Sequence, residues 1–247
     1  MPESELRRTL FENYRRGQAA LSSGAVYNDV SAFWPLYDAS YGDLVAGLSP
    51  SARILDAGCG HGSLIAWLHA HGLRFVVGVD LSPGDVAFAE THLGTGVVVL
   101  GEVEQHLRGC PKHYDAVFMK AMLEHVMKDQ LLPLLRAVAG ALTRDGVLVV
   151  EVPNMDWLLA SHERYLDLTH EVGFTRESLA ALLGLIFDQV DVRGSGLPAP
   201  TRSQRLLRRP FLALLRRLLY ILGEGANDVL FAHRSLVAVA SRPRQSA

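Results

Sequence analysis

The fold is decided by the stretch Ile54-Leu55-Asp56-Ala57-Gly58-Cys59-Gly60-His61-Gly62-Ser63. Its apolar first half predicts a buried strand, and Ser63 opens a segment with helical spacing. Between them lies a glycine-rich turn, where the absence of side chains lets a ligand approach the backbone closely. The start of the following helix supplies unpaired N–H donors. This order of strand, turn and helix predicts a nucleotide-type binding site, which dinucleotide-binding enzymes also use.

Two carboxylates indicate which ligand the turn binds. Asp56 stands two residues before the first glycine, where a pyrophosphate would otherwise rest. Its charge would repel a pyrophosphate by on the order of a few kcal/mol at low effective dielectric, whereas it would attract a cationic ligand. Asp80 ends the next apolar run, Val76–Asp80. A carboxylate there can accept both ribose hydroxyls, which suits an adenosine cofactor or NAD alike.

Short apolar runs alternate with amphipathic stretches from Ala52 onward, which is typical of strands and helices around a mostly parallel sheet. The expected strands are Arg53–Ala57, Phe75–Asp80, Val97–Leu100, Ala116–Met119, Val147–Val152, Val190–Arg193 and Leu236–Ala240. The expected helices are Ser63–His71, Pro83–His92, Gln130–Leu142 and Arg176–Leu183. We therefore predict an α/β fold, a Rossmann-like seven-stranded mostly parallel sheet with helices on both faces. Residues 1–50 are predicted to be an N-terminal helical cap on a domain of residues 51–247, with a helical insertion at 194–233 before the last strand.

The composition argues against several classes of protein. Lys and Arg number 24 against 26 Asp and Glu, so no overall field recruits nucleic acid, and we expect no nucleic-acid partner. Cys59 and Cys110 have neither metal-ligand spacing nor a disulfide framework, which fits a reducing cytoplasm. Residues Met1–Phe11 lack the apolar core of a secretory signal, and no apolar run is long enough for a transmembrane helix. We expect a cytoplasmic location.

Two later segments extend the pattern. Gly101-Glu102-Val103-Glu104 follows the third strand, where an acidic or backbone group can meet an adenine amino group. The segment Tyr114–Val126 supplies a fourth strand and a loop that ends in Leu-Glu-His-Val. In order and spacing, the four blocks between Ala52 and Val152 resemble the class I S-adenosylmethionine-dependent methyltransferases. The loop resembles that of quinone-biosynthesis methyltransferases in particular.

This resemblance implies S-adenosylmethionine as the cofactor and methyl transfer as the activity. It assigns Asp56, Gly58, Gly60 and Gly62 to the methionine part, Asp80 to the ribose, and Leu81, Glu102, Val103 and Glu104 to the adenine. It assigns the segment from Lys120 to His125 to the acceptor side, and we include Lys120 among the cofactor-binding residues. The sequence departs from the family at Glu102 and Val103, where members often have Asp followed by Ala.

Polar residues gather after the fifth strand, in Glu151–Asn154 and His162–Thr175, where open α/β sheets carry ligand-contacting loops. An acceptor hydroxyl or amine must lose a proton, so His125 and His170 are the candidate catalytic bases. Each histidine also has a structural interpretation, His125 as a packing residue of the cofactor loop and His170 as a loop anchor. A metal site from His162, Asp167, His170 and Glu171 lacks a recognised ligand motif, and we expect no metal.

The acceptor has two candidate classes. His170, Phe174 and Thr175 resemble a pattern in methyltransferases of bacterial polysaccharide and glycan pathways, with Thr175 as a helix N-cap. We therefore expect O-methylation of a sugar or glycan-type acceptor. The Leu-Glu-His-Val loop favours instead a small natural-product or quinone-like acceptor. A catalytically silent cofactor-binding regulatory protein is the alternative from another class, and the intact Asp56, glycines and Asp80 argue against it.

Residues 202–222, the arginine-leucine segment, combine an apolar stripe with a concentration of positive charge. The segment has no acid and contains Arg202, Arg205, Arg208, Arg209, Arg216 and Arg217. Pro210 is expected at a helix start, and Phe211, Leu214, Leu215, Leu218, Leu219 and Leu222 follow at helical spacing. One interpretation packs the stripe on the sheet or in a homodimer interface. The other lays the helix on the anionic inner face of a membrane, near a lipid-linked acceptor.

Overall fold

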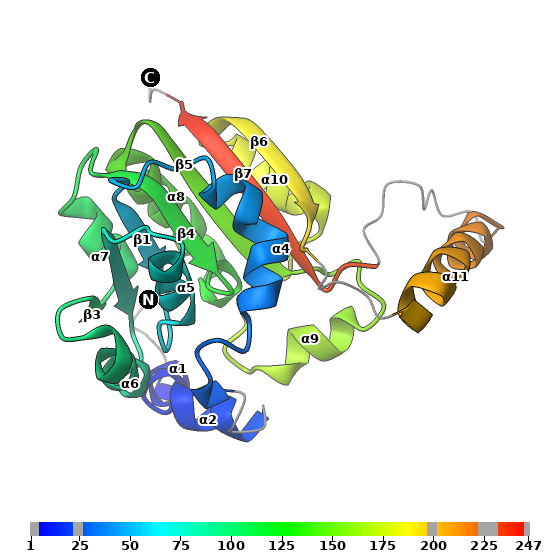
Figure 1. The fold of residues 1–247 in the computed structure, drawn as a ribbon, viewed down its shortest axis with the longest axis horizontal. Helices are drawn as coiled ribbons and strands as arrows, with labels where there is room; N and C mark the ends of the chain where they lie inside the picture. The colour runs from blue at the N-terminus through cyan, green and yellow to red at the C-terminus, as the bar shows by residue number, and fades with distance from the viewer. Residues whose placement is uncertain (1–4, 22–26, 197–201, 222–231, 245–247) are drawn as a thin grey trace.

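The computed structural model describes residues 5–21, 27–196, 202–221 and 232–244 (Figure 1). Its centre is a seven-stranded sheet in the order β3-β2-β1-β4-β5-β7-β6. The strands are β1 (Ile54–Ala57), β2 (Val76–Asp80), β3 (Val98–Leu100), β4 (Tyr114–Lys120), β5 (Leu142–Pro153), β6 (Phe187–Gly194) and β7 (Ser235–Pro243). Neighbouring strands from β3 to β5 are parallel, and β7 runs antiparallel to both β5 and β6. The predicted seven-stranded, mostly parallel sheet is confirmed.

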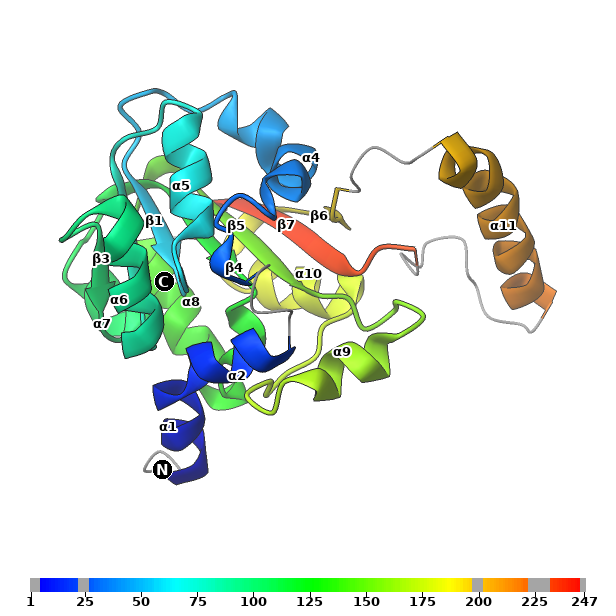
Figure 2. The ribbon, with the colours of Figure 1, turned by 60° about the horizontal axis from the view of Figure 1, so that its bottom comes forward.

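Helices cover both faces of the sheet, as expected (Figures 1 and 2). One layer contains α4 (Trp34–Val45), α5 (Ser63–Ala70) and α6 (Pro83–Leu93), and the other contains α7 (Val103–Arg108), α8 (Leu131–Ala141) and α10 (Arg176–Gly184). Successive strand residues point to opposite faces. In β4, Val117 packs in the cluster with α8, whereas Phe118 packs in the cluster with α5. The parallel strands are therefore buried on both sides, which explains their nearly continuous apolar runs.

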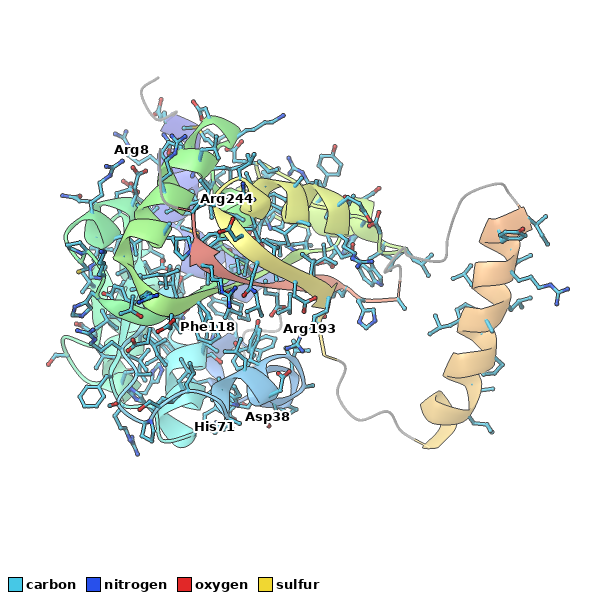
Figure 3. The ribbon with its side chains drawn as sticks, turned by 90° about the horizontal axis from the view of Figure 1, so that it is seen from above. Arg8, Asp38, His71, Phe118, Arg193 and Arg244 are labelled. Atoms are coloured by element: carbon cyan, nitrogen blue, oxygen red, sulfur yellow. The ribbon has the colours of Figure 1, made fainter. Side chains whose placement is uncertain are left out.

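Helix α4 is part of the body's core. The rings of Tyr37 and Tyr41 lie 5.8 and 6.2 Å from the ring of Trp67 on α5. The indole N–H of Trp67 donates to Asp38 at 2.8 Å, and Asp38 lies 3.4 Å from Nε2 of His71 (Figure 3). Within the predicted 1–50 cap, α4 thus packs with the sheet, and the boundary at residue 50 stays a prediction.

Three further helices lie at the carboxyl ends of the parallel strands (Figure 1). They are α1 (Glu5–Glu12), α2 (Tyr14–Leu21) and α9 (Ala160–Leu166). Polar contacts tie α2 to the body, because Gln18 donates to Asp167 at 2.6 Å and Arg15 donates to Asp85 at 3.1 Å. These helices therefore cover the edge at which open α/β sheets bind ligands.

Some expected boundaries differ from the structure. Helices α7 and α9 were not expected, since six or seven residues are too few for a periodic apolar pattern to stand out. The expected helix Gln130–Leu142 ends at Ala141, because Leu142 is already extended and pairs with Tyr114 in the sheet.

The arginine-leucine segment forms α11 (Arg202–Ile221), in the loop between β6 and β7. The expectation that Pro210 starts this helix is wrong, since Pro210 lies inside it. Proline removes one backbone hydrogen bond, here to the carbonyl of Leu206. Figures 1 to 3 show α11 apart from the body, so water can reach that carbonyl. Among the described helices, none is long and apolar enough to span a bilayer.

Candidate active site

A cavity of about 570 Å³ opens at the carboxyl ends of the parallel strands. Its lining comes from the ends of four strands and the loops that follow them: Asp56, Gly58 and Gly60 from β1 and its turn, Asp80 and Leu81 from β2 and its loop, Glu102, Val103 and Glu104 from after β3, and Lys120 and His125 from β4 and its loop. All the predicted site residues except Gly62 and His170 therefore contribute to one cavity. The topology explains this convergence, because β1 has β2 on one side and β4 on the other, and their ends meet at one edge.

The three glycines of the turn have positive φ angles of 74° at Gly58, 51° at Gly60 and 81° at Gly62. A Cβ on Gly60 would meet no protein atom within 4 Å, so the backbone there faces open space. A Cβ on Gly58 would come within 2.5 Å of Met122, and one on Gly62 within 2.6 Å of Leu93. Gly60 thus leaves room for a ligand, whereas Gly62 allows α5 to pack closely on α6.

Asp56 is a buried carboxylate, and one of its oxygens lacks a hydrogen-bond partner among the described residues. Its side chain lines the cavity, and Oδ2 has no hydrogen bond among the described residues. Burial raises the pKa of Asp56 to about 7, while nearby Lys120 lowers it and Asp80 raises it. A cationic ligand in the cavity would compensate the buried charge.

Asp80 is held in place by two backbone donors. The N–H of Gly60 donates to Oδ2 and the N–H of Ser82 donates to Oδ1, each at 2.8 Å. A carboxylate has about four acceptor positions, so both oxygens can still accept from a ligand diol. Burial raises the pKa of Asp80 to about 6, and the two backbone hydrogen bonds oppose that rise.

His125 is oriented by a threonine and an aspartate. Its Nδ1 lies 2.8 Å from the hydroxyl of Thr169, and that hydroxyl lies 2.6 Å from Oδ1 of Asp167. Burial alone would raise the pKa of Asp167, but hydrogen bonds from Thr169 hold it below its usual value. The ionised Asp167 must accept the hydroxyl proton, so the hydroxyl accepts from Nδ1–H of His125. The Nε2 of His125 is then left as a base.

The environment of His125 keeps its ring neutral. Burial, followed by the neighbouring His170, lowers the pKa of His125 to about 4. The ring packs edge-on against Tyr14 at 5.9 Å and Phe11 at 6.3 Å. A neutral imidazole lining the cavity can accept a proton from a bound hydroxyl at physiological pH.

His170 lies behind His125 and outside the cavity lining. The two rings are 4.8 Å apart, and Nδ1 of His170 lies 3.1 Å from the carbonyl oxygen of Glu163. The guanidinium of Arg164 donates to the carbonyl of His170 at 2.6 Å. These contacts favour the loop-anchor interpretation of His170.

One group of side chains in the described part of the chain has spacing suitable for a metal ion. Glu124, His125 and His170 offer ligand atoms within 4.8 Å of one another. This set shares only His170 with the candidate ligands considered from the sequence. Burial raises the pKa of Glu124 to about 8, which leaves its carboxyl protonated at neutral pH. The expected absence of a metal stays a prediction.

Several lining residues were not among the predicted site residues. The segment before β1 contributes Arg7, Phe11, Tyr14, Gln18, Tyr27, Phe33 and Tyr37, and later segments contribute Leu166 and Arg234. The spaced aromatic residues of the first 50 positions were visible in the sequence, but nothing there indicated their partners. Arg7 donates to the carbonyl of His125 at 2.9 Å and pairs with Glu171 at 3.1 Å. The acceptor side of the cavity thus has an aromatic and partly cationic wall.

Comparison with known sequences agrees with this architecture. Residues 55–150 match the model of a family described as a methyltransferase domain. A curated relative, the ubiquinone biosynthesis O-methyltransferase of Yersinia pestis, is 34% identical over 115 residues, which cover 44% of this chain and 46% of the relative. An equally similar enzyme occurs in Yersinia pseudotuberculosis. The chain thus spans about half the length of the curated relatives that it matches.

Solved structures share the fold over nearly the whole chain. A SAM-dependent methyltransferase from Archaeoglobus fulgidus has a TM-score of 0.62 at 20% identity, covering 96% of this chain and 99% of that one. The plantazolicin methyltransferase BpumL in complex with SAH has a TM-score of 0.59 at 16% identity, covering 97% and 96%.

The fold and the glycine turn agree with the match of residues 55–150 to a methyltransferase domain. The cofactor that such a domain implies is S-adenosylmethionine. The cavity fits it, because the unpartnered Asp56 oxygen suits a cation and the space beside Gly60 admits a ligand.

Proposed function

We propose that this protein methylates a hydroxyl oxygen of a small acceptor and that His125 is the base that removes the hydroxyl proton. S-adenosylmethionine supplies the reactive methyl group on a sulfonium. The observation that carries the proposal is the position of His125, which lines the cavity and has its Nδ1 2.8 Å from the hydroxyl of Thr169. In this reaction the acceptor oxygen would take the methyl group from the cofactor sulfur, which would leave as the demethylated product. The proton goes to Nε2 of His125.

The residues that would hold the cofactor are those at the ends of β1, β2 and β3. Asp56 would attract its positive charge, Asp80 would accept from its ribose hydroxyls, and the backbone at Gly60 would lie against it. Positioning and exclusion of water supply most of the acceleration for an already activated methyl donor. Helices α1 and α2 support that exclusion, because their side chains line the cavity.

The lining favours a flat, largely apolar acceptor of the natural-product or quinone-like class. Phe11, Tyr14 and Phe33 line the cavity with aromatic side chains, and Leu166 adds an aliphatic one. The curated relatives, named as ubiquinone biosynthesis O-methyltransferases, agree with this class.

The glycan acceptor depends on the pattern of His170, Phe174 and Thr175. Phe174 is buried and pairs with Asn154, and Thr175 forms a capping box with Ser178 at the start of α10. These contacts account for the pattern without a ligand, so no observation in the cavity favours a sugar. Acceptor profiling is the test that separates the two classes.

Calorimetry tests cofactor binding first. We expect S-adenosylmethionine and its demethylated product to bind and NAD to bind far more weakly, and the reverse order would overturn the assignment. Mass spectrometry of reactions with catechol-type phenols and with monosaccharides then tests the acceptor. We expect the phenols to gain the methyl group. Methylated sugars alone would support the glycan class, and cofactor binding with no turnover on either panel would support a regulatory protein.

The His125→Gln variant tests the base. We expect a loss of about 10²–10⁴-fold in kcat with unchanged affinity for the cofactor. The matched control is His170→Gln, since His170 is also a histidine of this cluster but does not line the cavity. A larger loss in the control than in His125→Gln would assign the base to His170.

A further inference from the structure

Helix α11 exposes an unusual amount of apolar surface for a helix so rich in charge. Its exposed large apolar side chains range from 49% to 76% exposure and are Leu206, Leu207, Phe211, Leu214, Leu218, Tyr220 and Ile221. All three figures show the helix away from the body (Figures 1 to 3). Contiguous exposed apolar surface of this kind marks a surface that binds something.

Five of these seven apolar residues form one stripe. Leu207, Phe211, Leu214, Leu218 and Ile221 follow one another at intervals of four, three, four and three, which is one face of an α-helix. At about 1.5 Å per residue, the stripe runs for about 21 Å along the axis. By the same helical spacing, Arg202, Arg205, Arg209 and Arg216 fall on the opposite face, and Arg208 and Arg217 fall on the two flanks.

The charged residues of the segment are all positive. Six of the 24 basic residues of the chain lie in residues 202–222, and none of the 26 acidic residues does. Two copies joined through their stripes would bring flanking arginines together, with no acid in the segment to pair with them. A surface that offers both an apolar layer and phosphate groups suits both faces of the helix.

We propose that α11 is a docking helix for an anionic lipid bilayer. The helix lies in the plane of the bilayer surface, its stripe enters the acyl boundary, and its arginines contact lipid phosphates. This proposal goes beyond methyl transfer and is independent of the identity of the acceptor.

The test uses the full chain and vesicle sedimentation. We expect vesicles of phosphatidylcholine with about one-third phosphatidylglycerol to retain the protein at low salt and to release it as salt screens the charges. Pure phosphatidylcholine vesicles should retain at least tenfold less. Equal retention on both kinds of vesicle, or retention on neither, would overturn the proposal.

Two pairs of charge reversals separate a local surface from overall charge. Arg216→Glu with Arg217→Glu should weaken retention on the anionic vesicles by tenfold or more. Arg74→Glu with Arg144→Glu changes the net charge equally at exposed positions of the body and should leave retention near that of the wild type. Equal losses in both double variants would reject a specific helix surface.

The apolar stripe has its own test. Leu214→Gln with Leu218→Gln should abolish retention while the thermal unfolding temperature and the elution volume in size exclusion stay those of the wild type. A lower unfolding temperature would mean that the stripe packs on the body. A wild-type dimer that becomes a monomer in this variant would mean that the stripe joins two copies. Either result would replace the membrane proposal.

Discussion

Thr169 and His125 are joined by a hydrogen bond of 2.8 Å across 44 residues of sequence. The same hydroxyl donates to Asp167, so the threonine fixes which nitrogen of His125 carries the proton. Removing the hydroxyl in Thr169→Val should lower kcat by about tenfold, the effect of losing about 1.4 kcal/mol in the transition state. Thr169→Ser keeps the hydroxyl and should retain most of the rate. Similar rates for all three proteins, compared at matched unfolding temperatures, would remove Thr169 from the mechanism.

Cofactor affinity should depend on pH through Asp56. Burial raises the pKa of this carboxyl to about 7, and only its ionised form attracts a cation. Below pH 7 the cofactor must displace a proton, so its affinity should fall by up to about tenfold per pH unit between pH 7 and 6. Calorimetry in buffers of different ionisation enthalpy should detect the released proton. Asp56→Asn should bind weakly with little pH dependence, and a steep dependence in that variant would point to another group.

Asp80 should be the stronger of two acidic contacts. Asp80→Ala should weaken cofactor binding by about 1–3 kcal/mol, because charge-assisted hydrogen bonds to the ribose are lost. Glu104 also lines the cavity, but its carboxylate pairs with Arg108 at 2.6 Å. Glu104→Ala should therefore change the affinity by less than about threefold. The comparison is a pair of calorimetric titrations, and the opposite ranking would move the principal acidic contact to the loop after β3.

Glu124 should make the protein less stable in alkali. Burial raises its pKa from 4.5 to about 8, so the native state retains a proton that the unfolded state has released. Its contribution to the free energy of unfolding is complete below pH 4.5 and is lost as the pH rises through about 8. The pKa of His125 is lowered instead, so its contribution to the free energy of unfolding depends on pH in the opposite direction. That contribution is complete above pH 6.5 and is lost as the pH falls.

Between pH 6.5 and 8, Glu124 therefore makes stability depend on pH, whereas the contribution of His125 stays constant. In urea unfolding, Glu124→Gln should gain stability relative to the wild type across this range, at a limiting slope of about 1.4 kcal/mol per pH unit. Parallel curves for the two proteins would show that Glu124 titrates normally in the native state.

Metal removal should leave methyl transfer unchanged. A protonated Glu124 is a poor ligand, although it stands close to His125 and His170. We expect elemental analysis to find less than one equivalent of bound metal and expect dialysis against EDTA to preserve the rate. Loss of activity that Mg²⁺ or Zn²⁺ restores would instead establish these three side chains as a metal site.

Much of the fold was predictable because local signals and the global arrangement agree. The glycine turn, the apolar runs and the amphipathic segments each favour one element, and together they favour one sheet. Helix α7 was not predicted because only two of its residues, Val103 and Leu107, are buried. The prediction that Pro210 starts a helix was wrong for another reason, because an exposed helix tolerates an internal proline that a buried helix would not.

The carboxylates of the cavity could be predicted because strand ends place them. Asp56 is the last residue but one of β1 and Asp80 is the last residue of β2, and parallel strands bring those ends together. The aromatic wall of the cavity could not be predicted, because it depends on contacts between distant parts of the chain. The bond from Arg7 to the carbonyl of His125 spans 118 residues, and the bond from Gln18 to Asp167 spans 149. No local pattern carries that information.

Along residues 5–20, which form α1 and most of α2, the structure has no buried residue. The hydrogen bonds of Arg7, Arg15 and Gln18 hold this segment over the cavity, while the apolar clusters of the core lie in other elements. Regions with few buried apolar contacts open locally at a small fraction of the global unfolding free energy. Ligand exchange and the integrity of the fold are therefore governed by separate sets of side chains. Substitutions in this segment can change the rate of product release without lowering the stability of the rest of the molecule.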